Sequence, residues 1–209
     1  MLLNKSSLRG LYAITDPQLL PGRQLLLGVE QALDGGARLI QYRDKLSNNA
    51  ARHANARALC ILCHNHGALF IVNDDIALAR STGADGVHLG QHDAPVQNAQ
   101  NQLGRDSIVG VSCHASLKDA LTAEELGASY VALGRFFPSQ TKPDAPQAPI
   151  QLLTDARAGL GIPIVAIGGI NQDNGRALID AGCDMLAVVH GLFGNNNIQQ
   201  HARAFSQLF

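Results

Sequence analysis

One apolar run of this chain ends in the sequence QYRDK, residues 41–45, which contains one amide and two cationic side chains. Strict alternation along a strand would place Gln41, Arg43 and Lys45 on one side of it. Such cations need anions, because unpaired buried charge is strongly disfavoured. One explanation is an internal salt bridge to Asp44 or Asp74. We favour the other, an anionic ligand, because arginine suits bidentate contact with phosphate.

Oxygen ligands follow the next two apolar runs, in the sequences NDD and HLGQHD. Asn73, Asp74 and Asp93 would meet at neighbouring strand ends. Carboxylate and amide oxygens beside an anion site suit Mg²⁺ that is bridged to substrate phosphates. Helix capping is the alternative explanation for Asn and Asp at such positions, and we prefer it for Asp75.

Zinc binding is a second possibility at His88 and His92, which are four residues apart. That spacing places two side chains on one face only in a helix. Because GVHLG has the composition of a strand, we instead interpret His88 as a hydrogen-bonded interior residue.

Two later segments carry groups that suit phosphate. Ser139, Thr141 and Lys142 lie in PSQTKPDAPQAP, which is longer than a structural connection needs, although a plain solvated loop is the alternative. In AIGGINQDN, Gly168 and Gly169 would let a backbone approach closely, as in the phosphate sites of some barrels. Glycine at a tight turn is the alternative explanation there.

The sequence CILCH, which begins at Cys60 and ends at His64, matches the pattern of covalent haem attachment. We interpret this match as chance, because a helix through this segment would pack Cys63 with Leu59 and Leu62. We expect reduced thiols at all four cysteines, Cys60, Cys63, Cys113 and Cys183.

Eight apolar runs alternate with helix-like stretches and would position these groups. They are GLYAITD, ARLIQYRD, ALFIVND, GVHLG, SIVGVS, YVALGRF, PIVAIGG and MLAVVHG. This alternation predicts an α/β fold with a parallel sheet. We expect a (β/α)8 TIM barrel that forms a single domain over residues 1–209, with its active site at the C-terminal ends of the strands. A doubly wound open sheet is the alternative, but it would leave MLAVVHG as an exposed apolar edge.

Composition excludes several classes of partner. The 209 residues are 46% hydrophobic and carry a net charge of −1, so the basic footprint of a nucleic-acid binder is missing. No stretch has the roughly 20 apolar residues of a membrane span, and MLLNKSSLRG does not resemble a signal peptide. We therefore expect a cytoplasmic protein with small phosphorylated partners; homo-oligomer formation is left open.

The ordered set YAITD, QxRxK, NDD, GxHLGQxD, FPSxTK and IPIVAIGGI resembles the thiamine phosphate synthase family over nearly the whole chain. The resemblance implies a transferase. It would condense 4-amino-2-methyl-5-(diphosphooxymethyl)pyrimidine with 4-methyl-5-(2-phosphooxyethyl)thiazole to give thiamine phosphate and pyrophosphate. The implied mechanism is a dissociative displacement assisted by Mg²⁺.

The resemblance also implies roles for particular residues. The pyrimidine diphosphate site would consist of Gln41, Arg43, Lys45, Asn73, Ser112 and Lys142. The residues with catalytic roles would be Arg43, Lys142 and Ser112, and the Mg²⁺ ligands would be Asp74 and Asp93. The thiazole phosphate site would consist of Ser139, Thr141, Gly169, Val189 and His190.

The chain departs from the family pattern at three positions. Arg135 stands where the family commonly has proline, Ser139 where it has threonine, and His190 where it has serine. The role of Arg135 and of the His190 imidazole is left open. Two other functions also remain: a thiazole tautomerase of the same barrel family, with His114 as acid or base, and a non-catalytic barrel that binds a phosphorylated ligand.

Overall fold

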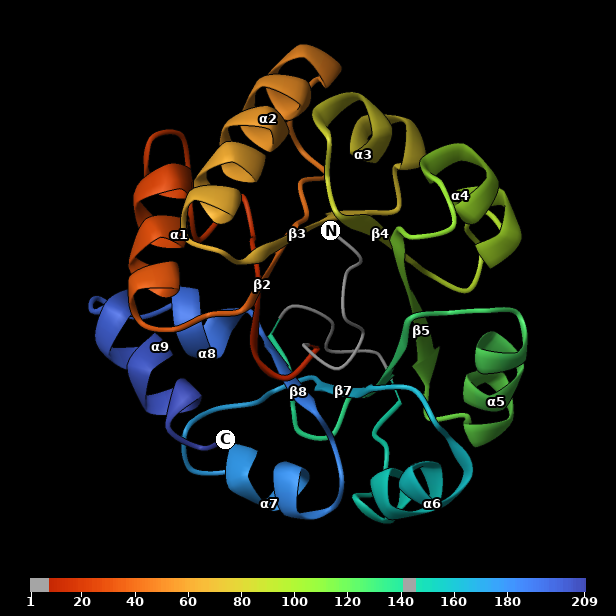
Figure 1. Cartoon of the computed structure of the whole chain (residues 1–209). Helices are drawn as coiled ribbons and strands as arrows, with labels where there is room; N and C mark the ends of the chain where they lie inside the picture. The colour runs from red at the N-terminus through yellow and green to blue at the C-terminus, as the bar shows by residue number, and fades with distance from the viewer. Residues whose placement is uncertain (1–7, 141–145) are drawn as a thin grey trace.

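In the computed structural model, which describes residues 8–140 and 146–209, parallel strands close into a barrel in the order β1 to β8 (Figure 1). The strands are β1 (Gly10–Ile14), β2 (Leu39–Tyr42), β3 (Leu69–Asn73), β4 (Gly86–Leu89), β5 (Ile108–His114), β6 (Tyr130–Gly134), β7 (Ile164–Ile167) and β8 (Met185–Val188). Each strand pairs with the next, and the pairing of β1 with β8 closes the ring. The predicted (β/α)8 barrel is confirmed, and the open sheet was the wrong alternative.

The helices form an outer ring around the strands (Figure 1). They are α1 (Gln24–Asp34), α2 (Asn49–Asn65), α3 (Ile76–Thr82), α4 (Val96–Leu103), α5 (Leu117–Glu125), α6 (Gln151–Gly159), α7 (Gly175–Asp180), α8 (His190–Phe193) and α9 (Ile198–Ser206). The helix α9 packs against α1 and β1, so the last helix of the outer ring contacts the first βα unit of the barrel.

Alternation along the strands divides the apolar side chains into two cores. One layer lies between the barrel and the helices and includes Leu11, Phe70 and Phe205. The other fills the barrel interior and includes Tyr12 and Tyr130, which are 1% and 0% exposed. Because the barrel interior is packed with side chains, we expect a ligand to bind at the C-terminal ends of the strands, as in other barrels of this type.

Two interpretations of local sequence are confirmed. Asp75 caps α3, since its carboxylate accepts a hydrogen bond from the Leu78 N–H at 2.9 Å. Cys60 and Cys63 lie in α2 and are 4% and 0% exposed, and burial raises the pKa of the Cys63 thiol, so both pack as thiols. Within residues 8–140 and 146–209, no helix has the length and apolar character that a membrane crossing needs.

Candidate active site

A cavity of about 290 Å³ lies at the C-terminal ends of the strands. All eight strands or the loops that follow them contribute to its wall. The predicted site residues that line it are Gln41, Arg43, Asn73, Ser112, Ser139, Gly169, Val189 and His190. The structure therefore brings most of the predicted binding residues to one place. Thr141 and Lys142 fall outside the described residues.

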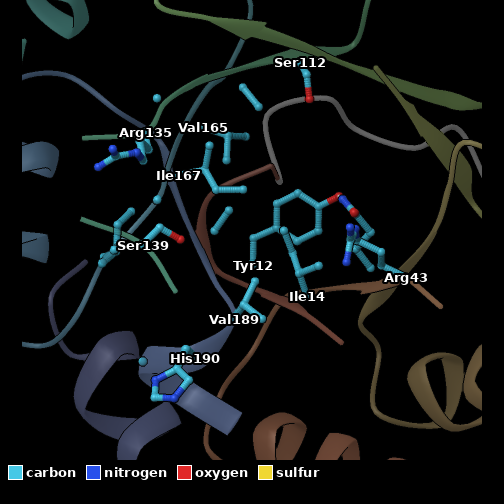
Figure 2. A pocket seen from close by; sticks show the side chains of 18 of the residues that line it. Tyr12, Ile14, Arg43, Ser112, Arg135, Ser139, Val165, Ile167, Val189 and His190 are labelled. Atoms are coloured by element: carbon cyan, nitrogen blue, oxygen red, sulfur yellow. The ribbon is translucent and has the colours of Figure 1, made fainter. Parts of the chain in front are cut away.

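The two ends of this cavity have different chemistry. Figure 2 shows Arg43 on one side and Arg135 on the other, with Ser139 on the same side as Arg135. Apolar side chains lie between them, namely Ile14, Val165 and Ile167. Because β2 and β6 stand opposite each other in the ring, two anions could bind here without sharing one cation.

The cations after β2 do not share one environment. The strand ends at Tyr42, so the predicted alternation does not extend to Lys45, and that expectation was wrong. Lys45 is 61% exposed and its Nζ lies 3.4 Å from the Asp74 Oδ2, which is the salt bridge considered as the alternative. Arg43 lines the cavity, and no ion pair involves its guanidinium within the part of the chain that the structure describes. Arg43 is therefore placed to meet an anionic ligand.

Asp74 and Asp93 face each other beside this end of the cavity. Asp74 has a left-handed backbone conformation (φ 63°), and its N–H donates to the His88 carbonyl at 2.8 Å. Burial and the neighbouring Asp93 carboxyl raise the pKa of Asp74, and Lys45 offsets this only in part. Asp93 accepts a hydrogen bond from the Gly90 N–H at 2.6 Å, which fixes its carboxylate.

This pair of carboxylates fits Mg²⁺. Two repelling oxygen ligands gain from a divalent cation, and Mg²⁺ is usually held by one or two carboxylates together with substrate phosphates. Among the described residues, no group of three or more His, Cys, Asp or Glu side chains could hold a metal alone. The remaining ligands would therefore come from substrate or water.

The glycine pair after β7 lines the cavity and also packs closely against the loop after β6. A Cβ on Gly168 would lie 2.2 Å from the Arg135 Cβ, and one on Gly169 would lie 2.2 Å from the Pro138 carbonyl oxygen. The close approach is thus to the loop after β6, and the Phe137 N–H donates to the Gly168 carbonyl at 3.0 Å. Through this loop, the glycines position Ser139 at the cavity.

Val189 and His190 lie where β8 passes into α8, at the same end of the cavity as Ser139. A Cβ on Gly194 would lie 2.8 Å from the His190 Cε1, so Gly194 leaves the space that this imidazole ring occupies. The larger side chain at a position where serine is common in the family is thereby accommodated.

Several residues of the cavity were not assigned to substrate binding from the sequence. Tyr12, His114 and Arg135 also line it. The interior position predicted for His88 is confirmed: its Nδ1 lies 3.0 Å from the Tyr130 hydroxyl and its Nε2 lies 2.8 Å from the Ser112 hydroxyl. Tyr12 could have been found from its position in YAITD. It lies two residues before Ile14, so both side chains point to the same face of the strand, which is the face toward the barrel interior.

Known proteins are similar to this chain over almost its full length. The thiamine-phosphate synthase of Thioalkalivibrio sulfidiphilus is 52% identical over 202 residues, covering 97% of this chain and 96% of that protein. The thiamine-phosphate synthase of Alcanivorax borkumensis is 51% identical over 205 residues, covering 97% and 94%.

Among solved structures, thiamine phosphate pyrophosphorylase from Pyrococcus furiosus superposes with a TM-score of 0.89 at 34% identity, over 98% of this chain and 97% of that one. A family model described as thiamine monophosphate synthase matches residues 11–192. The chain belongs to the thiamine monophosphate synthase family.

Proposed function

We propose that this chain is a transferase that joins the pyrimidine diphosphate to the thiazole phosphate, releasing thiamine phosphate and pyrophosphate. The observation that carries this proposal is the division of one cavity into two polar ends, with Arg43 at one and Ser139 at the other. Two phosphorylated molecules need such an arrangement if their reacting atoms are to meet between the ends. The names of the relatives, thiamine-phosphate synthases, support the same reaction.

The Arg43 end suits the diphosphate. Arg43 offers a planar fork of donors for phosphate oxygens. Asn73 lines the same cavity, and the exposed Lys45 pairs with Asp74, the residue after Asn73. We assign the pyrimidine diphosphate to these residues together with Gln41, Ser112 and Lys142. The assignment of Lys142 rests on sequence resemblance.

We assign Mg²⁺ to Asp74 and Asp93, whose facing carboxylates fit it. When bound, the ion would neutralise charge that develops on the leaving pyrophosphate. Lys45, which is paired with Asp74, adds a cation at the same place. The carboxylates of this chain thus hold positive charge where the leaving group gains negative charge.

The remaining steps need little covalent chemistry from the protein. The bond between the pyrimidine methylene carbon and the diphosphate oxygen breaks, and the thiazole nitrogen then attacks that carbon. Ile14, Val165 and Ile167 form an apolar wall between the two ends, which limits the access of water to the electron-deficient carbon. We assign the thiazole phosphate to Ser139, Thr141, Gly169 and the backbone at Val189 and His190.

Other expectations stay predictions. We propose that residues 1–209 act as one domain, that the site lies at the C-terminal mouth of the barrel, and that the protein is cytoplasmic. Buried free thiols at all four cysteines support a reducing compartment.

The test is to mix both substrates with Mg²⁺ and the protein and to measure thiamine phosphate and pyrophosphate. We expect equimolar products. Asp74→Ala and Lys142→Ala should each lower kcat by roughly 100-fold or more, the scale for loss of one preorganised electrostatic group.

Asp75→Ala is the matched control, since the adjacent carboxylate caps α3 and pairs with Arg52. It should lose stability and keep its turnover. Failure to form thiamine phosphate, or near-normal turnover of both site variants at saturating Mg²⁺, would contradict the proposed function.

A further inference from the structure

A continuous chain of hydrogen bonds crosses the barrel interior beneath the cavity, from β2 to β5. The Gln41 Nε2 donates to the Tyr12 hydroxyl at 2.7 Å, and that hydroxyl lies 2.7 Å from the Tyr130 hydroxyl. The Tyr130 hydroxyl lies 3.0 Å from the His88 Nδ1, and the His88 Nε2 lies 2.8 Å from the Ser112 Oγ. The two ends of this chain, Gln41 and Ser112, both line the cavity.

The three central residues of this hydrogen-bond network, Tyr12, Tyr130 and His88, are held rigidly. The Tyr12 and Tyr130 rings meet edge to face at 5.9 Å, and the His88 ring stacks on Tyr130 at 5.6 Å. Gly110 on β5 makes this possible, because a Cβ there would lie 2.0 Å from the Tyr130 Cζ. Since neither tyrosine is more than 1% exposed, water cannot take the place of either hydroxyl partner.

With the Gln41 Nε2 facing Tyr12, only one direction of donation satisfies every group in this network. With Gln41 donating to Tyr12, the Tyr12 proton must go to Tyr130, because a buried hydroxyl proton needs an acceptor. The Tyr130 proton then goes to the His88 Nδ1, which makes His88 the neutral tautomer with its proton on Nε2. His88 therefore donates to Ser112, whose own proton remains to donate to a ligand.

The opposite direction fails at Tyr12. If His88 carried a proton on Nδ1, Tyr130 would accept it and donate to Tyr12. Tyr12 would then accept hydrogen bonds from both Tyr130 and Gln41. Its own buried hydroxyl proton would have no acceptor in this hydrogen-bond network. The Tyr12 proton would find an acceptor only if the Gln41 amide rotated by about 180°. That rotation would exchange the amide oxygen and nitrogen, and so change which of them faces the cavity.

We propose that Tyr12 and Tyr130 are positioning residues for the pyrimidine. They orient the Gln41 amide so that its carbonyl oxygen is left as an acceptor, and they hold His88 in the Nε2–H tautomer so that Ser112 is left as a donor. The cavity thus presents an acceptor from β2 and a donor from β5. It selects a heteroaromatic ring with an N–H donor and a ring acceptor in the matching order. The inference rests on the proposed function for the identity of this ring.

The kinetic test is Tyr130→Phe, which removes the hydroxyl that links Tyr12 to His88. We expect kcat/KM for the pyrimidine diphosphate to fall about 10-fold to 100-fold, the scale for one buried hydrogen bond left unmade. KM for the thiazole phosphate should not change. Tyr42→Phe is the matched control, because its hydroxyl donates to Asp44 at 3.1 Å on the outer face of β2 and should leave both values unchanged. Equal changes for both substrates, or no difference from Tyr42→Phe, would overturn the inference.

Tyr12→Phe breaks the same chain one residue further along and should reproduce this selectivity if Tyr130→Phe does not fold. The two substitutions combined should cost much less than the product of the single effects, since both interrupt one network. Multiplicative effects would count against a network that acts as a unit.

A second measurement does not depend on turnover. The ¹⁵N shifts of the His88 imidazole, assigned by comparison with His88→Asn, should show the Nε2–H tautomer in the wild type and should move in Tyr130→Phe. A wild-type ring protonated on Nδ1 overturns the inference. If the wild type makes no thiamine phosphate, the proposed function fails, and the tautomer alone decides whether the network has this direction.

Discussion

Gly110→Ala is the substitution that should most clearly expose the packing under the cavity. The added Cβ would lie 2.0 Å from the Tyr130 Cζ, 2.3 Å from its hydroxyl oxygen and 2.4 Å from its Cε2. Ordinary carbon contacts begin near 3.5 Å, so the ring must move by more than an ångström. Tyr130 is fully buried, so its ring cannot move without displacing the side chains packed around it.

The cost has two parts. Overpacking of a dense core costs about 1–3 kcal/mol. The displaced hydroxyl also loses Tyr12 and His88, and each buried group left without a partner costs about 1–3 kcal/mol. We therefore expect a free energy of unfolding lower by at least roughly 3 kcal/mol, and a Tm lower by about 6 °C or more for a chain of this size.

The assay is urea and thermal unfolding, with kcat/KM for both substrates measured on the folded fraction. Gly159→Ala is the control, because a Cβ at this residue in α6 would lie 3.4 Å from the nearest atom, Leu121 Cδ2. It should be neutral or slightly stabilising. A Gly110→Ala protein with normal stability and normal pyrimidine kinetics would refute the placement of the Tyr130 ring.

Further predictions concern the two ends of the cavity. Without divalent cation, Asp74 should make the wild type more stable as the pH falls. Burial and Asp93 raise the pKa of Asp74 above its unfolded value of about 3.9, so the folded state binds the proton more tightly. Urea unfolding in chelator between pH 7 and pH 4 should show this gain relative to Asp74→Asn, and parallel curves would contradict it. Mg²⁺ at 100 times its Kd should stabilise the wild type by about 2.7 kcal/mol, and thermal unfolding of Asp93→Ala should show no such shift. Ser139→Ala should raise KM for the thiazole phosphate by roughly 10-fold, as for one lost hydrogen bond, while KM for the pyrimidine diphosphate stays constant; equal increases would show that the two ends are not separate.

The features that could be predicted from the sequence are those that follow from the regular alternation of apolar strands and helices. Strand and helix alternation led to the barrel, and the barrel brought together residues as distant in sequence as Arg43 and His190, because the C-terminal ends of parallel strands share one mouth. The capping role of Asp75 followed from local chemistry, since a short acceptor before a helix satisfies its free N–H groups.

What could not be predicted depends on contacts between distant residues. The two tyrosine hydroxyls that form a hydrogen bond inside the barrel are 118 positions apart in the sequence. The residues around each tyrosine give no sign that the two side chains are in contact. Gly168 and Gly169 line the cavity, but their close packing against Arg135 and Pro138 of another loop could not be read from the sequence. Lys45 was expected beside Arg43, yet the strand ends before it, and its partner is Asp74.

A crystal structure of the chain with thiamine phosphate, pyrophosphate and Mg²⁺ would most directly test the division of the cavity into two ends. We predict pyrophosphate against Arg43 with the ion on Asp74 and Asp93, and the phosphate of thiamine phosphate at Ser139 and Gly169. Pyrophosphate bound at Ser139, or an ion that does not contact either aspartate, would contradict the division of the cavity on which the proposed function rests.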